Sequence, residues 1–279
     1  YYEYVIYPSY SREFFLGDRI VKIAKKKKAI GQANHDHTLL KWESKLGGNY
    51  YNKVIDTGKD LLFEFTRNKI FFEKFLKRSI RLVKPKISLP KNFTHLIDLN
   101  RYVIIAPGAG SEFRRWSTEK FAAVIKFLLA EYEIDRIFII GSPNEFRIGE
   151  AIVNSLNETG VDQVDNLTKK LKLSQVPDFV SKAKLVISNE TSIPHFAAAV
   201  DTPCICISNG NHYLRFHPYP KEMNVSVKYL YPPDFRDIID SLADKSQFYY
   251  YKSQFDLNKI KTVVVKKAIK NQFTIIDNQ

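Results

Sequence analysis

Residues 185–208 read LVISNETSIPHFAAAVDTPCICIS, and this stretch decides the fold. Two short apolar runs, at 185–188 and 204–208, are typical of buried strands. Between them Pro194 fits the first turn of a helix, which we place at 193–200. A strand, a short helix and a second strand in so short a stretch predict a parallel βαβ unit.

The same alternation extends toward the N-terminus of this stretch. Ser117 is typical of a helix cap, and the pattern predicts strands and helices in turn, at 102–106, 117–132, 136–141, 144–156, 161–164 and 174–183. One further helix is expected at 256–271. Strands alternating with helices of this length predict an α/β fold with a doubly wound parallel sheet.

The first hundred residues are organised differently. Their predicted elements are a strand, a basic helix and a longer amphipathic basic stretch, at 4–7, about 13–27 and 59–84. The proline-containing stretch 84–100 is typical of a linker. We therefore predict two domains, 1–97 including the linker and 98–279.

Composition places the chain among soluble globular proteins. Of 279 residues, 44% are hydrophobic and 26% charged. No apolar run reaches the roughly 20 residues of a membrane span, and no signal-peptide pattern opens the sequence. Because the chain starts with Tyr1 and its only methionine is Met223, we expect it to begin within a longer natural chain. Cys204 and Cys206 suit buried thiols better than a disulfide, which favours a reducing cytoplasm.

Positive charge is concentrated in the first part of the chain. Residues 1–101 hold 21 Lys/Arg against 10 Asp/Glu, within a net charge of +13. Such a surface suits an acidic partner, and charge alone leaves open anionic lipid, a phosphorylated sugar and nucleic acid. The lysines at 25–28 and the basic residues of 69–84 are either solvated helix faces or contacts with an anionic membrane surface.

Candidate ligand-binding residues follow the predicted strands, because ligands lie beyond the carboxyl ends of the strands in open parallel sheets. In PGAGSEFRRWS, 107–117, Ser111 and the glycines let the backbone approach a ligand. Arg114 and Arg115 match phosphate oxygens, and the next helix points its positive N-terminus at the same space. This loop predicts a diphosphate site; the alternative is a loop with two solvated arginines.

Two further loops follow predicted strands. In GSPNE, Glu145 is expected either to accept hydrogen bonds from ribose hydroxyls or to favour the start of its helix. In SNETSIPH, Thr191 and Ser192 offer hydroxyl and backbone donors to phosphate, and Glu190 is a candidate for sugar hydroxyls. His195 is a candidate ligand contact, although a packed, hydrogen-bonded histidine beneath the loop is the favoured interpretation.

Metal and cofactor motifs are weak in this sequence. His35-Asp36-His37 lacks partner ligands, so a solvated loop is favoured over half a metal site. There is no DxD pair of the kind that holds a metal-bound nucleotide sugar, and a Ser-His-Asp set cannot be assembled. We expect no metal and no cofactor.

Together the loops resemble family 9 glycosyltransferases, the lipopolysaccharide heptosyltransferases and their relatives. The resemblance rests on PGAGSEFRRWSTEKF, IIGSPNE and SNETSIPHFAAAVDTP, and YPSYSRE followed by KKKKAIG also looks family-like. It implies a GT-B fold, two Rossmann-like domains with parallel sheets, of which the N-terminal one is incomplete here. It also implies transfer of a sugar, typically heptose from an ADP-linked donor, onto an acidic glycolipid or other glycan at the cytoplasmic face of the bacterial inner membrane.

Carried over by position, the resemblance places the diphosphate at Ser111 and Arg115, and the nucleoside at Glu145. Thr191 and Ser192 would hold the phosphates and Glu190 the donor sugar. Glu190 and Ser192 replace the family's Asp and Gly, which predicts a tighter sugar pocket, a less free backbone and a donor sugar other than the usual heptose.

The family's catalytic base is an Asp in a glycine-rich loop near its N-terminus. Leu16-Gly17-Asp18 resembles that loop only superficially, because it follows YPSYSRE and falls inside the predicted basic helix. We therefore expect the base to be absent from this chain and leave the catalytic residue unknown.

Other functions remain open at this stage. A nucleotide-sugar-binding or scaffold protein without catalysis would keep the same loops, and a nucleotide-sugar epimerase would keep the same fold. Nucleic-acid binding rests on charge alone, without a recognition motif, so we expect no nucleic-acid partner.

Overall fold

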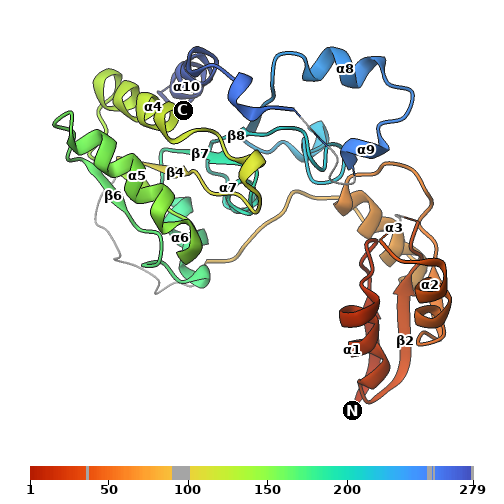
Figure 1. Cartoon of the computed structure of the whole chain (residues 1–279). Coiled ribbons are helices and arrows are strands. Elements are labelled where there is room, and N and C mark those ends of the chain that lie inside the picture. Colours follow the sequence, from red (N-terminus) through yellow and green to blue (C-terminus); the bar gives the residue numbers. More distant parts are fainter. Residues whose placement is uncertain (36–37, 90–100, 250–252, 254, 278–279) are drawn as a thin grey trace. The chain divides into compact units, whose positions relative to one another are not determined.

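The computed structural model describes residues 1–35, 38–89, 101–249, 253 and 255–277 (Figure 1). The chain forms two compact units. One comprises Tyr1–Val83 with His212–His217, and the other Lys84–Asn211 with Pro218–Gln279. The predicted boundary between residues 97 and 98 lies outside the described residues.

The larger unit is built on a parallel sheet whose described strands follow the order β6-β5-β4-β7-β8-β9. In chain order these are β4 Tyr102–Ala106, β5 Arg136–Ile139, β6 Val164–Asn166, β7 Leu185–Asn189, β8 Cys204–Ile207 and β9 Val227–Leu230. This order is that of a doubly wound sheet, so the predicted fold class is confirmed. The order of the strands reverses between β4 and β7, which is the point where open α/β sheets typically bind their ligands.

Helices cover both faces of this sheet. Alternate residues of a strand point to opposite faces, so Val103 and Ile105 pack on one side and Ile104 on the other. The first face is covered by α4 Thr118–Glu131, α5 Phe146–Asn157 and α10 Thr262–Asp277; the second by α6 Val176–Ser181 and α7 Ile193–Ala199. Burial on both faces explains the continuous apolar runs of β4 and β8.

The smaller unit holds a parallel sheet in the order β1-β2-β3. Its elements are β1 Tyr2–Tyr7, a π-helical turn Phe14–Asp18, α1 Arg19–Ile23, β2 Lys26–Gln32, α2 Lys41–Gly48, β3 Lys53–Ile55 and α3 Glu64–Leu76. Val21 packs with Ala29 in one buried cluster, and Ile30 packs with Phe71 in another.

The basic helix predicted over about 13–27 is only partly correct: 14–23 are helical, as the π-helical turn and α1, and the remainder is not. Helical structure ends at Ile23, and Lys26 already belongs to β2. Ala29 to Gln32 are buried in the sheet, while Lys27 and Lys28 are exposed at the start of the same strand. Pairing with β1 and β3 therefore overrides the local pattern, because burying an apolar strand end gains more than extending a charged helix.

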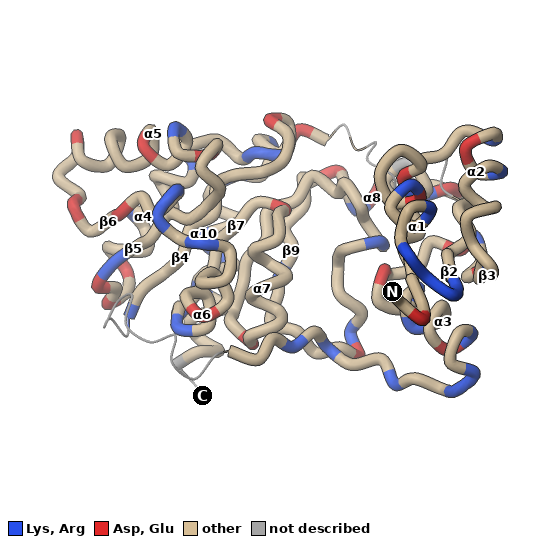
Figure 2. The backbone as a smooth tube through the Cα atoms, turned by 90° about the horizontal axis from the view of Figure 1, so that it is seen from below, with Lys and Arg blue, Asp and Glu red and all other residues tan. Residues whose placement is uncertain are grey.

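The amphipathic basic helix predicted over 59–84 is only partly correct, since α3 ends at Leu76. Lys77 adopts a left-handed φ of 54°, and the Glu73 carboxylate accepts a hydrogen bond of 2.9 Å from the Ile80 N–H. The chain thus turns back, and Arg78 and Arg81 are not on the helix. Figure 2 shows Lys and Arg along α1, the start of β2 and the segment after α3.

Several short elements are absent from the sequence-based prediction: β2, α2 and β3 in the smaller unit, and β9, α8 Phe235–Ser241 and α9 Ser246–Tyr249 in the larger one. The predicted strand at 161–164 lies later, as β6. The terminal helix starts at Thr262 rather than 256, after a 3-10 turn at Leu257–Lys259. Within the described residues, none of the helices combines the length and apolarity needed to span a membrane.

Candidate functional site

Three segments meet at the carboxyl edge of the sheet near the β4–β7 reversal. They follow β4 (107–117), β7 (190–192) and β8 (208–211), three strands that are neighbours in the sheet. Because β7 is bonded to both β4 and β8, its loop lies between the other two. This arrangement is that of a ligand site in an open α/β sheet.

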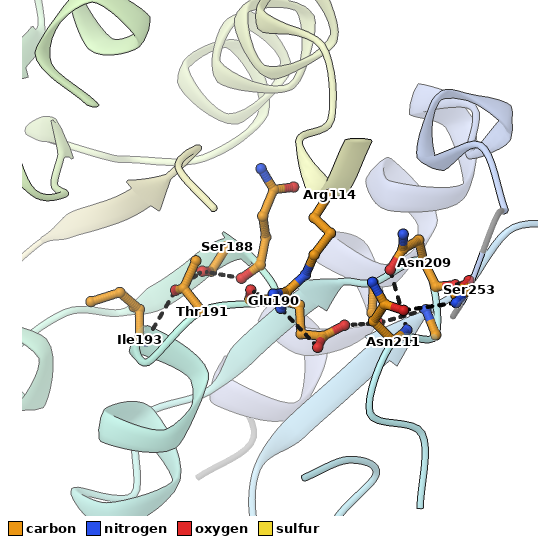
Figure 3. Close-up of polar contacts among 11 residues, drawn as sticks. Arg114, Ser188, Glu190, Thr191, Ile193, Asn209, Asn211 and Ser253 are labelled. Carbon is orange, nitrogen blue, oxygen red and sulfur yellow. Dashed lines mark hydrogen bonds and ion pairs between the residues drawn. The ribbon is translucent and has the colours of Figure 1, made fainter. Parts of the chain in front are cut away.

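The first and second segments are joined by Arg114 and Glu190 (Figure 3). Arg114 Nη2 donates to Glu190 Oε1 at 2.9 Å and to the Glu190 backbone carbonyl at 2.8 Å. The side chains are 12% and 9% exposed. The second carboxylate oxygen, Oε2, accepts a 2.6 Å hydrogen bond from Ser208 Oγ, in the third segment. Glu190 therefore ties all three segments together.

Asn189 fixes the first loop at both ends. Its Nδ2 donates to the Pro107 carbonyl at 2.7 Å, and its Oδ1 accepts from the Trp116 N–H at 3.2 Å. Asn189 is fully buried, so both of its amide groups are satisfied where water is excluded. Sequence reasoning missed this residue; the signal was a polar amide at the end of an otherwise apolar strand.

Arg115 differs from Arg114 in its partners. Its Nε and Nη2 both donate to the Ala109 carbonyl, at 3.2 and 3.0 Å. In the described part of the chain no carboxylate pairs with it. Ser111, half-buried, accepts at its carbonyl from the Arg114 N–H at 3.1 Å, closing the short 3-10 helix Glu112–Arg114.

The residues predicted in SNETSIPH, after β7, lie before and inside α7. Thr191 Oγ1 accepts from the Ile193 N–H at 3.2 Å, and the Ser192 carbonyl accepts from the His195 N–H at 3.1 Å. His195 Nδ1 is 2.8 Å from the hydroxyl of Tyr219. The hydrogen-bonded histidine favoured by the sequence is thus present in the structure, and burial raises the pKa of its tyrosine partner.

The Glu145 carboxylate lies between the loops that follow β4 and β5. Its Oε2 accepts from the Ser142 N–H at 2.6 Å, which is a helix-capping contact. A Cβ added to Gly108 would stand 1.8 Å from Glu145 Oε1, and one added to Gly141 would stand 2.6 Å from Oε2. The two glycines therefore leave the space that this carboxylate occupies, between the ends of β4 and β5.

The expectation that the N-terminus of α4 contributes to ligand binding stays a prediction, because groups of the protein itself bond at this helix end. The Ser117 N–H donates to Asn258 Oδ1 at 3.0 Å, and Trp116 Nε1 donates to the Ile260 carbonyl at 2.9 Å. Glu119 adds its own carboxylate to the first turn, where a backbone hydrogen bond lowers its pKa. Side chains of the protein itself thus occupy this helix end, which leaves the arginines as the positive groups of the loop.

Asp18 and His35 lie in the smaller unit. Asp18 is fully buried, pairs with Arg12 at 3.0 and 2.7 Å, and accepts from the Tyr51 hydroxyl at 2.6 Å. All of these contacts are structural, in keeping with leaving the catalytic base unassigned. His35 Nε2 is 2.8 Å from Asp56 Oδ1, and Asp36 and His37 lie outside the described residues. Over the described ranges no group of three or more His, Cys, Asp or Glu side chains is placed to hold a metal ion.

Residues 19–238 match the family described as glycosyltransferase family 9 (heptosyltransferase), and the match covers well over half of the chain. The protein belongs to this family. The three polar segments at the β4–β7 reversal lie inside the matched region, so the predicted resemblance is confirmed.

Curated relatives of this family 9 member are heptosyltransferases. The chain is 29% identical over 124 residues to lipopolysaccharide heptosyltransferase 3 of Escherichia coli, covering 44% of this chain and 35% of the relative. It is 28% identical over 102 residues to lipopolysaccharide heptosyltransferase 2 of Salmonella typhimurium, covering 35% and 28%. The matched segments thus span about a third of the length of these relatives.

Solved structures show the same fold. The E. coli ADP-heptose lps heptosyltransferase II is similar with a TM-score of 0.70 at 16% identity, over 99% of this chain and 77% of that one. The E. coli heptosyltransferase WaaC with ADP is similar with a TM-score of 0.67 at 20% identity, over 97% and 73%. At these identities the likeness shows the fold alone, which is GT-B.

Proposed function

We propose that this family 9 member is a glycosyltransferase. It moves heptose or a similar sugar from an ADP-linked donor to a lipopolysaccharide-type or other glycan acceptor. The observation that carries the proposal is the Arg114–Glu190 contact at the β4–β7 reversal, beside an Arg115 that pairs with no carboxylate of the described residues. Family membership and the likeness to a heptosyltransferase solved with ADP support the choice of ADP.

We assign the diphosphate, the nucleoside and the sugar of the donor to different loops according to the charge of their residues. Arg115, which has no carboxylate partner in the described residues, and Ser111 bind the diphosphate, helped by the hydroxyls of Thr191 and Ser192. Glu145 accepts from the nucleoside. Glu190 binds the sugar, because a carboxylate held by Arg114 and Ser208 is a fixed acceptor for sugar hydroxyls. His195 orients the start of α7 through Tyr219.

The reaction follows from this placement. A carboxylate takes the proton of the acceptor hydroxyl, and the acceptor oxygen forms a bond to the anomeric carbon from the face opposite the diphosphate. The bond from the anomeric carbon to the diphosphate breaks, and the nucleoside diphosphate leaves with the electron pair. Attack from the opposite face inverts the anomeric centre. Arg115 neutralises charge that develops on the leaving group, which is the part a metal ion plays in other transferases.

The acceptor is assigned to the smaller unit because of its charge. Residues 1–83 of this unit hold 17 Lys/Arg against 9 Asp/Glu, which suits an acidic, phosphorylated glycolipid. Exposed apolar side chains on the turn before α1, on α1 and on α2 favour contact with a membrane surface: Phe15, Leu16, Ile20, Ile23, Trp42 and Leu46. Lysines flank them, so the membrane surface is an anionic one, at the cytoplasmic face.

Product analysis tests this proposal. ADP-heptose and a heptose-deficient lipopolysaccharide are incubated with the protein, and released ADP and the anomeric configuration of the product are measured. Release of ADP with an inverted linkage, lost in Arg115→Ala, is expected. A retained linkage contradicts the mechanism. Binding of ADP-heptose without any release of ADP favours the alternative, a nucleotide-sugar-binding protein without catalysis.

A further inference from the structure

The segment 208–211, which follows β8, lies beside the Arg114–Glu190 contact and was not identified from the sequence. Asn189 and Ile207 are register partners in β7 and β8, so the residues after them emerge side by side. Ser208 Oγ donates to Glu190 and accepts from the Gly210 N–H at 3.0 Å. The segment is thus part of the same site.

Asn209 is held in place by its neighbours. Its Oδ1 accepts from the Asn211 N–H at 3.2 Å, and its backbone carbonyl accepts from Ser253 Oγ. Asn211 Oδ1 in turn accepts from the Ser253 N–H at 2.8 Å. Gly210 has a left-handed φ of 84°, and a Cβ there would stand 2.0 Å from the Phe235 ring. The position of the Asn209 side chain is therefore determined by the fold.

Two buried donors remain at this point. Asn209 is 1% exposed, and its Nδ2 has no hydrogen-bond partner in the described part of the chain; the same is true of Arg114 Nε. Figure 3 shows the Asn209 amide nitrogen pointing away from Asn211 and Ser253. Buried donors cost free energy unless an acceptor meets them, so both atoms favour a ligand that supplies acceptor oxygens.

Charge indicates whether these acceptor oxygens belong to a phosphate or to a sugar hydroxyl. The Arg114 guanidinium is paired with the Glu190 carboxylate, and the Asn209 amide is uncharged. A phosphate oxygen would gain little there and is better placed at Arg115. A sugar hydroxyl is neutral, can accept from Nδ2, and can donate its own proton to a Glu190 oxygen. Donors at Asn209 and Arg114 with an acceptor at Glu190 therefore suit hydroxyl groups, which can both accept and donate.

We infer that Asn209 and Arg114 Nε form, with Glu190, a subsite that binds hydroxyl groups of the donor sugar and so contributes to sugar specificity. This inference rests on the proposed function. With this subsite, the segment 208–211 after β8 becomes the third segment that contributes to the donor site. Ser208 is then a positioning residue for Glu190.

Calorimetric titration separates the sugar from the nucleotide. The wild type and Asn209→Asp are each titrated with ADP and with ADP-heptose, or with UDP and UDP-glucose if UDP is the nucleotide that binds. Asp keeps the acceptor oxygen for the Asn211 N–H and removes the Nδ2 donor. The subsite predicts at least about tenfold weaker binding of the nucleotide sugar, the loss expected when a hydrogen bond to a buried polar group is removed. Binding of the free nucleoside diphosphate stays within about twofold, the limit of a change in hydrogen bonding at that ligand.

A second variant covers the case in which Asn209→Asp does not fold. Arg114→Lys keeps a positive charge for Glu190 and removes Nε, so it predicts the same selective loss. The exposed Asn157→Asp, at the end of α5, is the control and binds both ligands as the wild type does. Equal weakening of nucleotide and nucleotide sugar, or wild-type binding of both, overturns the subsite. If the wild type binds no nucleotide sugar, the proposed function fails and the subsite fails with it.

Discussion

The Arg114 guanidinium donates to both the side chain and the backbone carbonyl of Glu190, and this pair connects the loop after β4 with the loop after β7. Glu190 is buried, so the free energy of the pair depends on both partners being present.

Arg114→Ala removes the guanidinium that pairs with the buried Glu190 carboxylate. We expect the free energy of unfolding to fall by about 2–4 kcal/mol, as when one partner of a buried pair is removed. Urea unfolding measures this change. Arg136→Ala is the matched control, because Arg136 and its partner Asp165 are 43% and 47% exposed and 3.7 Å apart. It should cost less than about 1 kcal/mol. Equal unfolding midpoints for the two variants would show that the Arg114 pair has no structural role.

Gly108→Ala tests the space that Glu145 occupies. The added methyl would stand 1.8 Å from Glu145 Oε1 and must displace the carboxylate from its contact with Ser142. We expect a loss of about 1 kcal/mol or more in stability, the typical value for a lost helix cap, together with weaker nucleotide binding. Gly110→Ala in the same loop meets nothing within 4 Å and should be neutral or slightly stabilising. If both variants bind nucleotide alike, Glu145 does not contribute to the donor site.

The thiols of Cys204 and Cys206 are free and fully buried in β8, and burial raises the pKa of both. Native protein should therefore resist alkylation by iodoacetamide at pH 9, whereas protein in urea reacts at both positions. The prediction from sequence that these are buried thiols is confirmed by the structure.

The same thiols make stability depend on pH. A raised pKa in the folded state contributes stability that is present below the unfolded thiol pKa of about 8.5 and is lost as pH rises above it. We expect the urea midpoint to fall above about pH 8.5, the unfolded thiol pKa, and to fall less steeply in a Cys204→Ala/Cys206→Ala variant. Identical slopes for the two proteins would assign the loss to other groups.

Ile23→Ser tests the membrane contact proposed for the smaller unit. Ile23 is 76% exposed at the end of α1 beside Lys22, and its loss should weaken sedimentation with phosphatidylglycerol vesicles while stability is unchanged. Val263→Ser, on α10 of the larger unit, removes a side chain that is 63% exposed and serves as the control. Equal binding to anionic and phosphatidylcholine vesicles would contradict an anionic membrane partner.

The sheet of the larger unit was predictable because its strands are buried on both faces and read as uninterrupted apolar runs. The predicted limits of β4, for example, agree with the structure at both ends, Tyr102 and Ala106. In the smaller unit the lysines before Ala29 suggested a helix, and only pairing with β1 and β3 makes them part of a strand. Such tertiary pairing cannot be read from a local pattern.

For the site, the structure places Arg114 and Glu190 in contact, yet their donor-binding roles stay predictions. Asn189, Ser208 and Asn209 were missed, because a polar residue at a strand end is ordinary until its partners are known. The fold brings Ser208 to Glu190 across 18 positions in sequence. The sequence also could not show that the backbone N–H of Ser117, before α4, is already bonded. Its partner, Asn258, lies in a segment distant in sequence.

Thermal unfolding with nucleotides tests the donor site most directly. The wild type and Arg115→Ala are heated with ADP, UDP, GDP, CMP and ADP-heptose. A ligand present at about 100 times its dissociation constant adds roughly 2.7 kcal/mol, which raises Tm by several degrees in a protein of this size. We predict this increase with ADP and ADP-heptose in the wild type and its loss in Arg115→Ala. An unchanged Tm with every nucleotide would contradict the account.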